Sequence, residues 1–412
     1  MDLKTQVGKV RAASWRLAQL TTAQKNQALA ALAEALDTHG PDLLQANQRD
    51  LQEQAGKLSS PLYQRLKLDA AKLATLRQGC RDLMALPDPV GRVLLRNSLA
   101  PDLVLERVTV PLGVLAVIFE SRPDVVPQIL GLALKSSNAL ILKGGHEALN
   151  THHAFRGLLR TLAQTCPFLP ADWALLIDTR EEVHEILQME ESIDLVIPRG
   201  SNEMVRKIQQ ATRIAVLGHA DGICHLYVDE KCDIEMAVRL AINAKVQYPS
   251  ACNALETLLV AAPVAGEFLP RFAAEAATYP VEIRGCGRTR AFLPDCILAT
   301  EQDWHTEYGD LRLSIRVVGG VDEAIDHINH YGSHHTDTIV TADSNSAAHF
   351  LQAVDSACVF HNASTRFADG FRFGLGSEVG ISTSKLHARG PVGLEGLVTY
   401  KYKLHGHGQT VD

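Results

Sequence analysis

Cys252 is the residue whose type and setting most directly predict chemistry. It lies in the segment Gln247–Leu259, where a polar Tyr-Pro-Ser turn runs into an apolar stretch. A thiolate presented at such a boundary can attack an acyl group and hold it as a thioester. Most free cysteines are small buried hydrophobic residues, so a packed thiol remains the alternative for Cys252 taken alone.

Two glycine turns are candidates for phosphate binding, since no Gly-x-Gly-x-x-Gly follows the strand predicted at 114–119. Lys143-Gly144-Gly145 ends a predicted strand, where a lysine can reach a ribose or a phosphate. Pro198-Arg199-Gly200-Ser201 ends another strand and opens a helix. Gly200 would let the backbone approach a pyrophosphate, and Ser201 would lie at the helix N-terminus. Plain turns without a ligand are the alternative for both segments.

The 17 histidines raise the question of a metal site. None stands in a His-Glu-x-x-His frame, and no nearby carboxylate or cysteine completes a ligand set for the densest group. We therefore predict structural or surface roles for these histidines, and no metal. That group consists of His327, His330, His334 and His335.

Length, charge and cysteine usage narrow the class of protein. A chain of 412 residues, 46% of them hydrophobic, is enough for two or three packed domains. The net charge of -7 argues against a nucleic-acid partner. No apolar run approaches the roughly 20 residues that span a bilayer, and the first residues lack a signal-peptide core. The eight scattered cysteines fit reduced thiols, so we expect a cytoplasmic protein without membrane contact.

The order of predicted elements is that of an α/β protein with two parallel sheets. Residues 1–85 are predicted to be helical, and residues 92–110 form paired strands around a turn at Pro101-Asp102. Strands and helices then alternate in two successive regions, which favours parallel sheets with helical crossovers. The first region has strands at 114–119, 139–143, 173–178 and 194–197; the second has strands at 226–228, 257–260, 311–318 and 338–340.

Five blocks of sequence, in the family's own order, resemble the glutamate-5-semialdehyde dehydrogenases, also called gamma-glutamyl phosphate reductases, of the aldehyde dehydrogenase superfamily. They cover essentially the whole chain. They are Val110–Asp124, Tyr248–Asn253, Ser364–Phe367, Phe373–Thr383 and Arg389–Leu394.

The resemblance implies an aldehyde dehydrogenase-like fold with two Rossmann-type domains and a small β oligomerisation flap. The NADP-binding domain would comprise 1–91 and 111–225, the catalytic domain 226–370, and the flap 92–110 and 385–412. The implied reaction is NADPH-dependent reduction of L-glutamyl 5-phosphate in proline biosynthesis. A homodimer or homotetramer is implied, and the resemblance leaves open whether a glutamate 5-kinase hands over the acyl phosphate.

The resemblance also assigns roles at the reacting centre. Cys252 matches the family's nucleophile. Hydrolytic relatives carry a glutamate base in a segment that corresponds here to residues 217–222. This segment contains no glutamate, so a thioester on Cys252 would be protected from hydrolysis. Arg122 stands about where those relatives place an oxyanion-holding Asn. It would bind the acyl phosphate or the oxyanion, with an ion pair to Asp124 or Glu120 as the alternative.

Further matches concern cofactor and substrate. Lys143 matches the lysine that contacts the adenosine ribose, and His146 stands where NAD-preferring relatives carry a ribose-binding Glu, which favours NADP. Glu307 resembles the glutamate that holds the nicotinamide ribose. Ser364, Arg366 and His219 are our candidates for substrate binding, with a core histidine as the alternative for His219.

Overall fold

The computed structural model describes residues 2–219 and 221–411, with the backbone alone at residues 60 and 61. Met1 and Asp412, at the ends of the predicted domains, and residue 220, in the segment that lacks the glutamate base, lie outside the described residues. The chain divides into two compact units. Unit 1 comprises 1–218, 374–381 and 391–412, and unit 2 comprises 219–373 and 382–390. The functions predicted for the domains stay predictions.

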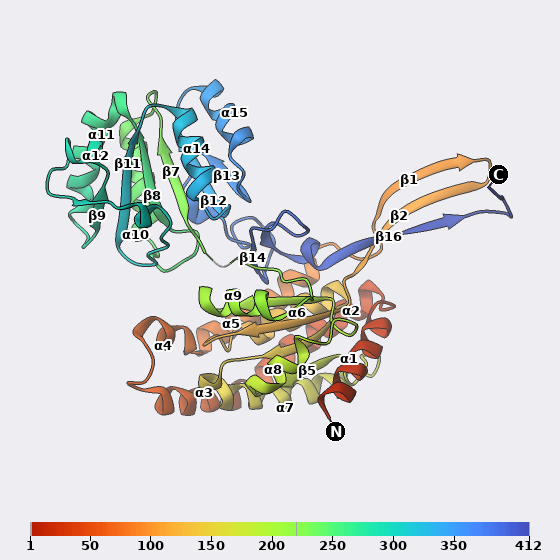
Figure 1. Cartoon of the computed structure of the whole chain (residues 1–412). Helices are drawn as coiled ribbons and strands as arrows, with labels where there is room; N and C mark the ends of the chain where they lie inside the picture. Colours follow the sequence, from red (N-terminus) through yellow and green to blue (C-terminus); the bar gives the residue numbers. More distant parts are fainter. Residues whose placement is uncertain (1, 220, 412) are drawn as a thin grey trace. The chain divides into compact units, whose positions relative to one another are not determined.

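Unit 1 begins with five helices, as the sequence predicts for residues 1–85 (Figure 1). Thr21 caps the second helix: its side chain accepts from the Gln24 amide, and the Gln24 side-chain oxygen accepts from the Thr21 amide. The apolar face of that helix is buried, with Leu29 and Leu32 wholly inaccessible, and packs against α5 and α6. The helices are α1 (Leu3–Leu17), α2 (Thr22–Thr38), α3 (Gly40–Gln54), α4 (Ser60–Leu66) and α5 (Ala70–Ala85).

A four-stranded parallel sheet in the order β5-β4-β3-β6 forms the centre of unit 1. All six residues of its inner strand β3 are buried, as expected for a strand covered on both faces. Two predicted strands have the observed bounds. The elements are β3 (Val114–Phe119), α6 (Val125–Ser136), β4 (Ala139–Lys143), η1 (His146–Ala148), α7 (Leu149–Thr165), β5 (Ala174–Ile177), α8 (Arg180–Ile186), β6 (Leu195–Arg199) and α9 (Asn202–Ala211).

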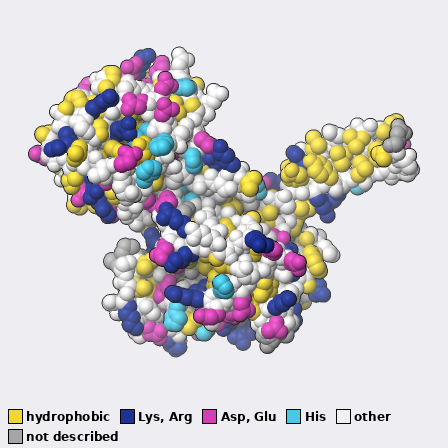
Figure 2. Space-filling model, in the orientation of Figure 1, with side chains coloured by type: hydrophobic (Ala, Val, Ile, Leu, Met, Phe, Trp, Pro, Cys, Tyr) yellow, Lys and Arg dark blue, Asp and Glu magenta, His cyan; other side chains and the backbone are white. Residues whose placement is uncertain are grey.

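An antiparallel sheet of three strands, which we call the flap, also belongs to unit 1. β2 (Leu103–Pro111) lies between β1 (Val93–Ala100) and β16 (Val398–His405), and the predicted turn at Pro101-Asp102 is confirmed. Both outer strands are exposed along nearly their whole length. Figure 2 shows hydrophobic side chains gathered on this sheet.

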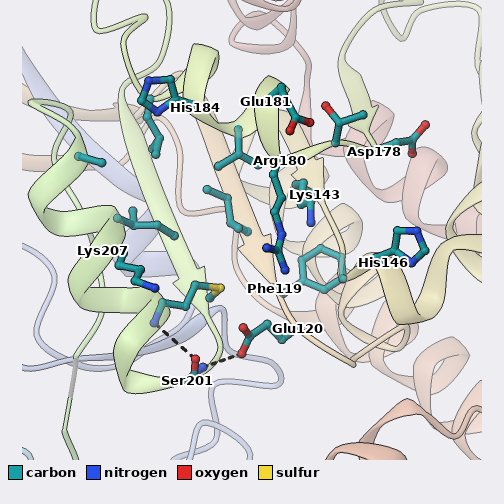
Figure 3. Close-up of a pocket in the computed structure, with 18 of the residues that line it drawn as sticks. Phe119, Glu120, Lys143, His146, Asp178, Arg180, Glu181, His184, Ser201 and Lys207 are labelled. Atoms are coloured by element: carbon teal, nitrogen blue, oxygen red, sulfur yellow. Dashed lines mark hydrogen bonds between the residues drawn. The ribbon is translucent and has the colours of Figure 1, made fainter. Parts of the chain in front are cut away.

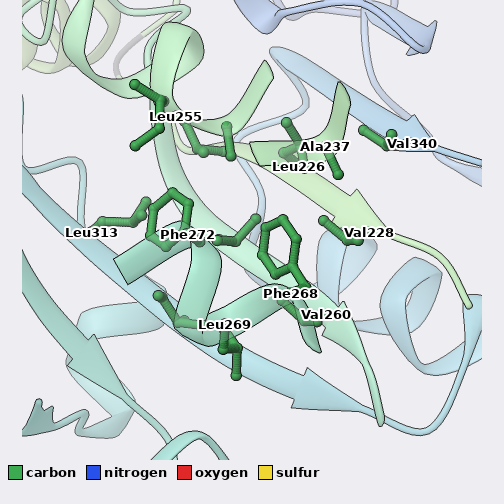
Figure 4. Packing of buried hydrophobic residues seen from close by; sticks show 14 of the residues in the cluster. Leu226, Val228, Ala237, Leu255, Val260, Phe268, Leu269, Phe272, Leu313 and Val340 are labelled. Carbon is green, nitrogen blue, oxygen red and sulfur yellow. The ribbon is translucent and has the colours of Figure 1, made fainter. Parts of the chain in front are cut away.

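Unit 2 is built on seven parallel strands in the order β10-β9-β11-β8-β7-β12-β13. Successive residues of its central strands point to opposite faces, and both faces are buried. Leu226 and Val228 of β7 pack with Phe268 and Phe272 of helix α11 (Figure 4). Tyr227, between them, packs on the other face with residues of α14 and α15. Helices therefore cover both faces of this sheet, as predicted for a Rossmann-type domain.

The sequence analysis missed the short elements of unit 2, because strands of two to four residues carry little periodicity. It also missed one longer helix of ten residues, Ser344–Ala353. The predicted elements are confirmed as β7 (Cys224–Val228), α10 (Ile234–Val246), β8 (Leu255–Ala261), α11 (Ala262–Ala276), β11 (Arg312–Val318), α14 (Val321–Tyr331) and β12 (Thr336–Val340). The missed elements are β9 (Glu282–Gly285), α12 (Gly287–Arg290), β10 (Ile297–Leu298), α13 (Glu301–Trp304), α15 (Ser344–Ala353), β13 (Cys358–His361) and η2 (Thr365–Phe367).

The remaining elements lie in the C-terminal part of the chain, where it passes back and forth between the units. They are β14 (Gly380–Ser382), β15 (Gly390–Val392) and η3 (Leu394–Leu397). Among the described residues, no helix has both the length and the hydropathy that crossing a membrane requires.

Candidate active site

Three chemically active side chains precede three neighbouring strands of unit 2. Cys252 comes just before β8, His335 comes directly before β12, and His219 lies in the loop that leads to β7. These strands are adjacent in the order β8-β7-β12 and run parallel, so their amino ends meet at one edge of the sheet. The sulfur and a nitrogen of each ring accordingly lie within 4.8 Å of one another.

The backbone around Cys252 is fixed by turns and by one close approach. The Ala251 amide donates to the Tyr248 carbonyl (3.1 Å), and the Ala254 amide donates to the Ala251 carbonyl (2.8 Å). A Cβ at Gly222 would lie 2.1 Å from the Cys252 carbonyl oxygen, so only glycine lets these two backbone segments touch. The thiol itself is partly buried, at the end of a turn that leads into β8, where the sequence predicted it.

His335 and His219 control the charge on Cys252. Burial alone would raise the pKa of the thiol, but the nearby His335 and His219 side chains outweigh burial and hold it well below its ordinary value. His335 is wholly buried and is oriented by a 2.8 Å hydrogen bond between its Nδ1 and Thr336 Oγ1. The two imidazole rings contact each other edge to face, with centroids 4.7 Å apart. The arrangement favours a thiolate beside both rings, the state in which a cysteine attacks an acyl group.

The sequence analysis missed His335, to which it gave a structural or surface role. Its position directly before a predicted strand of the second sheet was the available signal. His327, from the same group, is a core residue: burial lowers its pKa to about 2, and its ring packs against Trp304 at 5.5 Å. Two histidines eight residues apart thus have different roles because only one stands at the edge of the sheet that carries the thiol.

Arg366 lies in the same unit and brings a second charge near the thiol. It is only 9% exposed, its Nε donates to Gln247 Oε1 (2.9 Å), and its guanidinium stands over the Tyr248 ring at 5.7 Å. Burial lowers its pKa, as does Arg372, while the Cys252 thiolate opposes that shift. Such a cation suits a carboxylate, and its predicted contact with substrate stays a prediction.

Ser364, Asn253 and Glu307 hold the surrounding loops. Ser364 is buried, and its hydroxyl accepts from the Arg366 amide at 3.4 Å, so it caps the short turn η2. Asn253 Nδ2 donates to the Ala368 carbonyl (2.8 Å), which ties the Cys252 loop to the Arg366 segment. Glu307 Oε2 accepts from the Gly222 amide (2.9 Å). The roles predicted for Ser364 in substrate binding and Glu307 in cofactor binding are untested.

Unit 1 has a hollow of about 860 Å³ at the carboxyl ends of its strands, the edge at which parallel α/β sheets bind nucleotides (Figure 3). Lys143, Arg180 and Lys207 contribute positive charge to it, and Ser201 lies at its rim. Burial lowers the pKa of Lys143, while Glu147 opposes that shift. The hollow is large enough for a dinucleotide, and its cations can hold phosphates. Carboxylates line it as well: Glu120, Glu147, Asp178, Glu181 and Glu203, the last of which is paired with Lys207.

Gly144 and Gly200 lie in the same region, at positions where any larger residue would clash with a neighbouring side chain. A Cβ at Gly144 would lie 1.4 Å from His152 Cε1, and one at Gly200 would lie 2.5 Å from Glu120 Oε2. The Ser201 amide donates to that same carboxylate oxygen (2.7 Å), and Ser201 is the N-cap of α9. The helix end predicted to receive a pyrophosphate is thus occupied by Glu120, which leaves Lys143 and Arg180 as the better phosphate partners.

The carboxylate of Glu147 is bound by Ser121 and is therefore not available to bind a ribose. Its Oε1 accepts from the Ser121 amide (2.5 Å) and the Ser121 hydroxyl (2.7 Å). Burial would raise the pKa of Glu147, but these hydrogen bonds outweigh burial and lower it. A carboxylate held in this way does not compete for ribose hydroxyls, and the cations Lys143 and Arg180 in the same hollow can hold a phosphate. The sequence analysis missed Arg180, whose signal was its position just past β5.

Arg122 follows β3 in unit 1 and is partly buried. None of the ion pairs within residues 2–219 and 221–411 involves Arg122, so the predicted alternative of a salt bridge to Asp124 or Glu120 is not formed. Its assignment to the acyl phosphate or the oxyanion stays a prediction.

Two Rossmann-type parallel sheets, one with a nucleotide-sized hollow and one with an activated cysteine, define a thiol-dependent dehydrogenase of the aldehyde dehydrogenase class. The sequence profile of the aldehyde dehydrogenase family matches residues 1–284. A gamma-glutamyl phosphate reductase from Synechococcus sp. (strain JA-3-3Ab) is 56% identical over 99% of this chain and 91% of its own length. One from Pelotomaculum thermopropionicum is 52% identical over 100% of this chain and 94% of its own.

A solved structure extends the match from sequence to fold. The crystal structure of gamma-glutamyl phosphate reductase from Thermotoga maritima is 39% identical, covers 100% of both chains and has a TM-score of 0.96. The chain therefore belongs to the aldehyde dehydrogenase family and, within it, to the gamma-glutamyl phosphate reductases. The predicted family and fold class are confirmed.

Proposed function

We propose that this chain reduces L-glutamyl 5-phosphate to L-glutamate 5-semialdehyde with NADPH, releasing phosphate, as the second step of proline biosynthesis from glutamate. Full-length identity of 52–56% to gamma-glutamyl phosphate reductases supports the reaction. One observation in this chain carries the proposal: the sulfur of Cys252 and a nitrogen of each of two imidazole rings lie within 4.8 Å of one another, and no carboxylate belongs to that cluster of described residues.

The thiolate of Cys252 attacks the acyl carbon of the substrate in the first half of the reaction. A sulfur–carbon bond forms, the carbon–oxygen bond to phosphate breaks, and phosphate leaves with the electron pair. The imidazole of His219 or of His335 would assist the departure of the phosphate. The resulting thioester accepts a hydride far more readily than a carboxylate does, and its collapse to the aldehyde returns the thiolate.

The thioester must survive until it is reduced. Hydrolytic aldehyde dehydrogenases place a carboxylate base beside it, and the segment that would carry that base contains no glutamate between 217 and 222. Glu307, which follows in the same unit, is engaged with the Gly222 amide. Asp221 is the carboxylate of that segment, and it does not belong to the His219–Cys252–His335 cluster. Phosphate rather than water is therefore the expected partner of the thioester in the reverse reaction.

Lys143 and Arg180 are the residues that would hold NADPH by its phosphates, in the hollow at the carboxyl edge of unit 1. When bound, NADPH supplies the hydride. Lys143 would contact the adenosine ribose and Arg180 the 2′-phosphate, and Glu307 keeps the cofactor role predicted from the sequence. Gly200 and Ser201 would bind the cofactor only if the Glu120 carboxylate gave up the Ser201 amide, to which it is bound. Arg122, Ser364, Arg366 and His219 remain our candidates for the acyl phosphate and the substrate's polar ends.

Phosphate dependence tests the proposed function. Purified protein is supplied with NADP and glutamate semialdehyde, which is in equilibrium with pyrroline-5-carboxylate, and NADPH formation is measured as phosphate is varied. The proposal predicts a rate that rises from near zero with phosphate and then saturates. Equal rates with and without phosphate would instead indicate a hydrolytic aldehyde dehydrogenase.

The flap is proposed to join copies of this chain into a homodimer or homotetramer. Its outer strands expose large apolar side chains that a lone chain would leave in water. Sedimentation of wild type and of a double variant, Leu99→Asp with Tyr402→Asp, tests this: the wild type should be oligomeric and the variant monomeric. The exposed large apolar side chains of the flap's outer strands are Val93, Leu94, Leu95, Leu99, Tyr400, Tyr402 and Leu404.

A cytoplasmic location is proposed because the reaction requires a reduced Cys252, and all eight cysteines are free thiols. The acyl phosphate is labile in water, so it must come from an ATP-dependent kinase acting on glutamate. Cell fractionation tests the location, and co-purification with the glutamate 5-kinase of the same cell tests for direct transfer.

A further inference from the structure

The nucleophile cluster of unit 2 is also a donor set for a metal ion. Cys252 offers a sulfur, and His219 and His335 each offer a ring nitrogen, with the three atoms within 4.8 Å of one another. No sequence motif predicts this set of ligands, because its members come from three separate loops. Thiolate and imidazole are the ligands that Zn²⁺ selects, and three protein ligands leave one coordination position open.

His335 is prepared for coordination by its surroundings. Its Nδ1 is taken by the Thr336 hydroxyl at 2.8 Å, which fixes the ring and leaves Nε2 as the available nitrogen. That Nε2 is buried without a hydrogen-bond partner among the described residues, in a side chain that is 0% exposed. Metal-bound histidines have this same pattern, with one nitrogen held by a neighbour and the other directed at the ion.

We infer that the His219–Cys252–His335 cluster binds Zn²⁺ reversibly, and that the bound ion blocks the nucleophile. Ligands of one tetrahedral zinc ion lie roughly 3.6 Å apart, given bond lengths of about 2.0–2.3 Å. Small rotations of the partly buried Cys252 and His219 side chains bring the cluster to that size. The sulfur lone pair that attacks substrate is then bound to the metal, and any proton on the thiol or the rings is released.

Cobalt reports such a site directly, without any enzyme assay. Co²⁺ added to the metal-free full chain should bind at one equivalent, with a thiolate-to-metal charge-transfer band and the intense visible bands of a tetrahedral ion. Zn²⁺ should displace it. Cys252→Ser should abolish the charge-transfer band, and His335→Gln should weaken binding by at least about tenfold. Thr336→Val, which removes only the orienting hydroxyl, should weaken it by about tenfold.

Cys286→Ser is the matched control, because Cys286 is also a partly buried thiol with a lowered pKa. Burial would raise that pKa, but hydrogen bonds, among them the one between its sulfur and the Thr289 hydroxyl, outweigh burial. It should leave the cobalt spectrum unchanged. In the unaltered protein, one equivalent of Zn²⁺ should also protect Cys252 from iodoacetamide, as mapped by peptide mass spectrometry. Absence of protection, or a cobalt spectrum that survives Cys252→Ser, would overturn the inference. Because neither readout involves turnover, failure here leaves the proposed reaction untouched.

Discussion

The two units of this chain use opposite edges of their parallel sheets. In unit 1 the charged residues of the hollow follow the strands: Lys143 ends β4, and Arg180 comes just after β5. In unit 2 the reactive side chains precede the strands: Cys252 comes before β8 and His335 directly before β12. The carboxyl edge of a parallel sheet is the usual ligand edge of such folds, and unit 1 follows that rule. Unit 2 shows that the amino edge can hold a site when its loops supply the chemistry.

The two sites also differ in the kind of charge they present. Unit 1 offers lysine and arginine, whose positive charge is nearly independent of pH and suits fixed phosphates. Unit 2 offers a thiol whose pKa is held well below its ordinary value by the neighbouring imidazoles, so its charge depends on the state of its surroundings. Binding in unit 1 should therefore tolerate changes in pH that alter the reactivity of unit 2, and each prediction below tests one side of this contrast.

The largest expected effect is the loss of the nucleophile. Cys252→Ser should lower turnover by about four orders of magnitude or more, because no other thiol in the cluster can form the thioester. NADPH binding, measured by fluorescence titration, should stay within about twofold of wild type because the cofactor is proposed to bind on unit 1. Retained turnover would refute the assignment, and Cys286→Ser should behave like wild type.

The next effect concerns the hollow of unit 1. Arg180→Ala should raise the KM for NADPH by about 10- to 100-fold with little change in kcat, since a charge-assisted hydrogen bond to phosphate contributes about 1.5–3 kcal/mol. The KM for NADH, which lacks the 2′-phosphate, is the internal control and should change far less. Steady-state kinetics with both cofactors measures the difference, and equal effects on NADPH and NADH would remove Arg180 from the 2′-phosphate site.

A smaller effect is expected in the pH dependence of Cys252. The neighbouring imidazoles lower the pKa of the thiol, so its alkylation by iodoacetamide should reach full rate well below the ordinary thiol pKa of about 8.5. His335→Gln removes one positive neighbour, and the inflection should therefore move to higher pH. Alkylation rates measured across pH give the shift. An unchanged inflection would mean that His335 does not set the charge on Cys252.

The last prediction, which concerns neither site directly, is on the stability of unit 1. Burial lowers the pKa of His152 to about 4, from 6.5. The unfolded chain therefore binds more protons between those values, and the free energy of unfolding should fall as pH drops from about 6.5 toward 4. The linked loss is at most about 3 kcal/mol. Urea unfolding across this range should show the slope in wild type and a shallower slope in His152→Gln; identical slopes would contradict the account.

Sequence reasoning found the elements whose pattern is local and missed those that depend on neighbours in space. The buried strands at 114–119 and 139–143 were predicted with the observed bounds because continuous apolar runs between turns are strong signals. Cys252 was found through its turn and its family motif. His335 was missed because its role comes from the strand order, in which β12 lies between β7 and β13. Arg180 was missed because only the folded unit shows which side chains line its hollow.

The role of Glu120 could not be predicted either. Its carboxylate occupies the N-terminus of α9, which the sequence analysis had assigned to a pyrophosphate. That contact joins residues 81 positions apart in the chain. Only the side-by-side pairing of β3 with β6 brings them together.

Direct detection of the acyl group on Cys252 tests the central claim. The protein is mixed with excess NADP and glutamate semialdehyde in the absence of phosphate, and NADPH formation and intact mass are followed together. We predict a burst of one NADPH per active site, a glutamyl adduct that maps to Cys252, and discharge of that adduct when phosphate is added. Continuous turnover without phosphate, or a burst without an adduct on Cys252, would contradict a thioester protected from water.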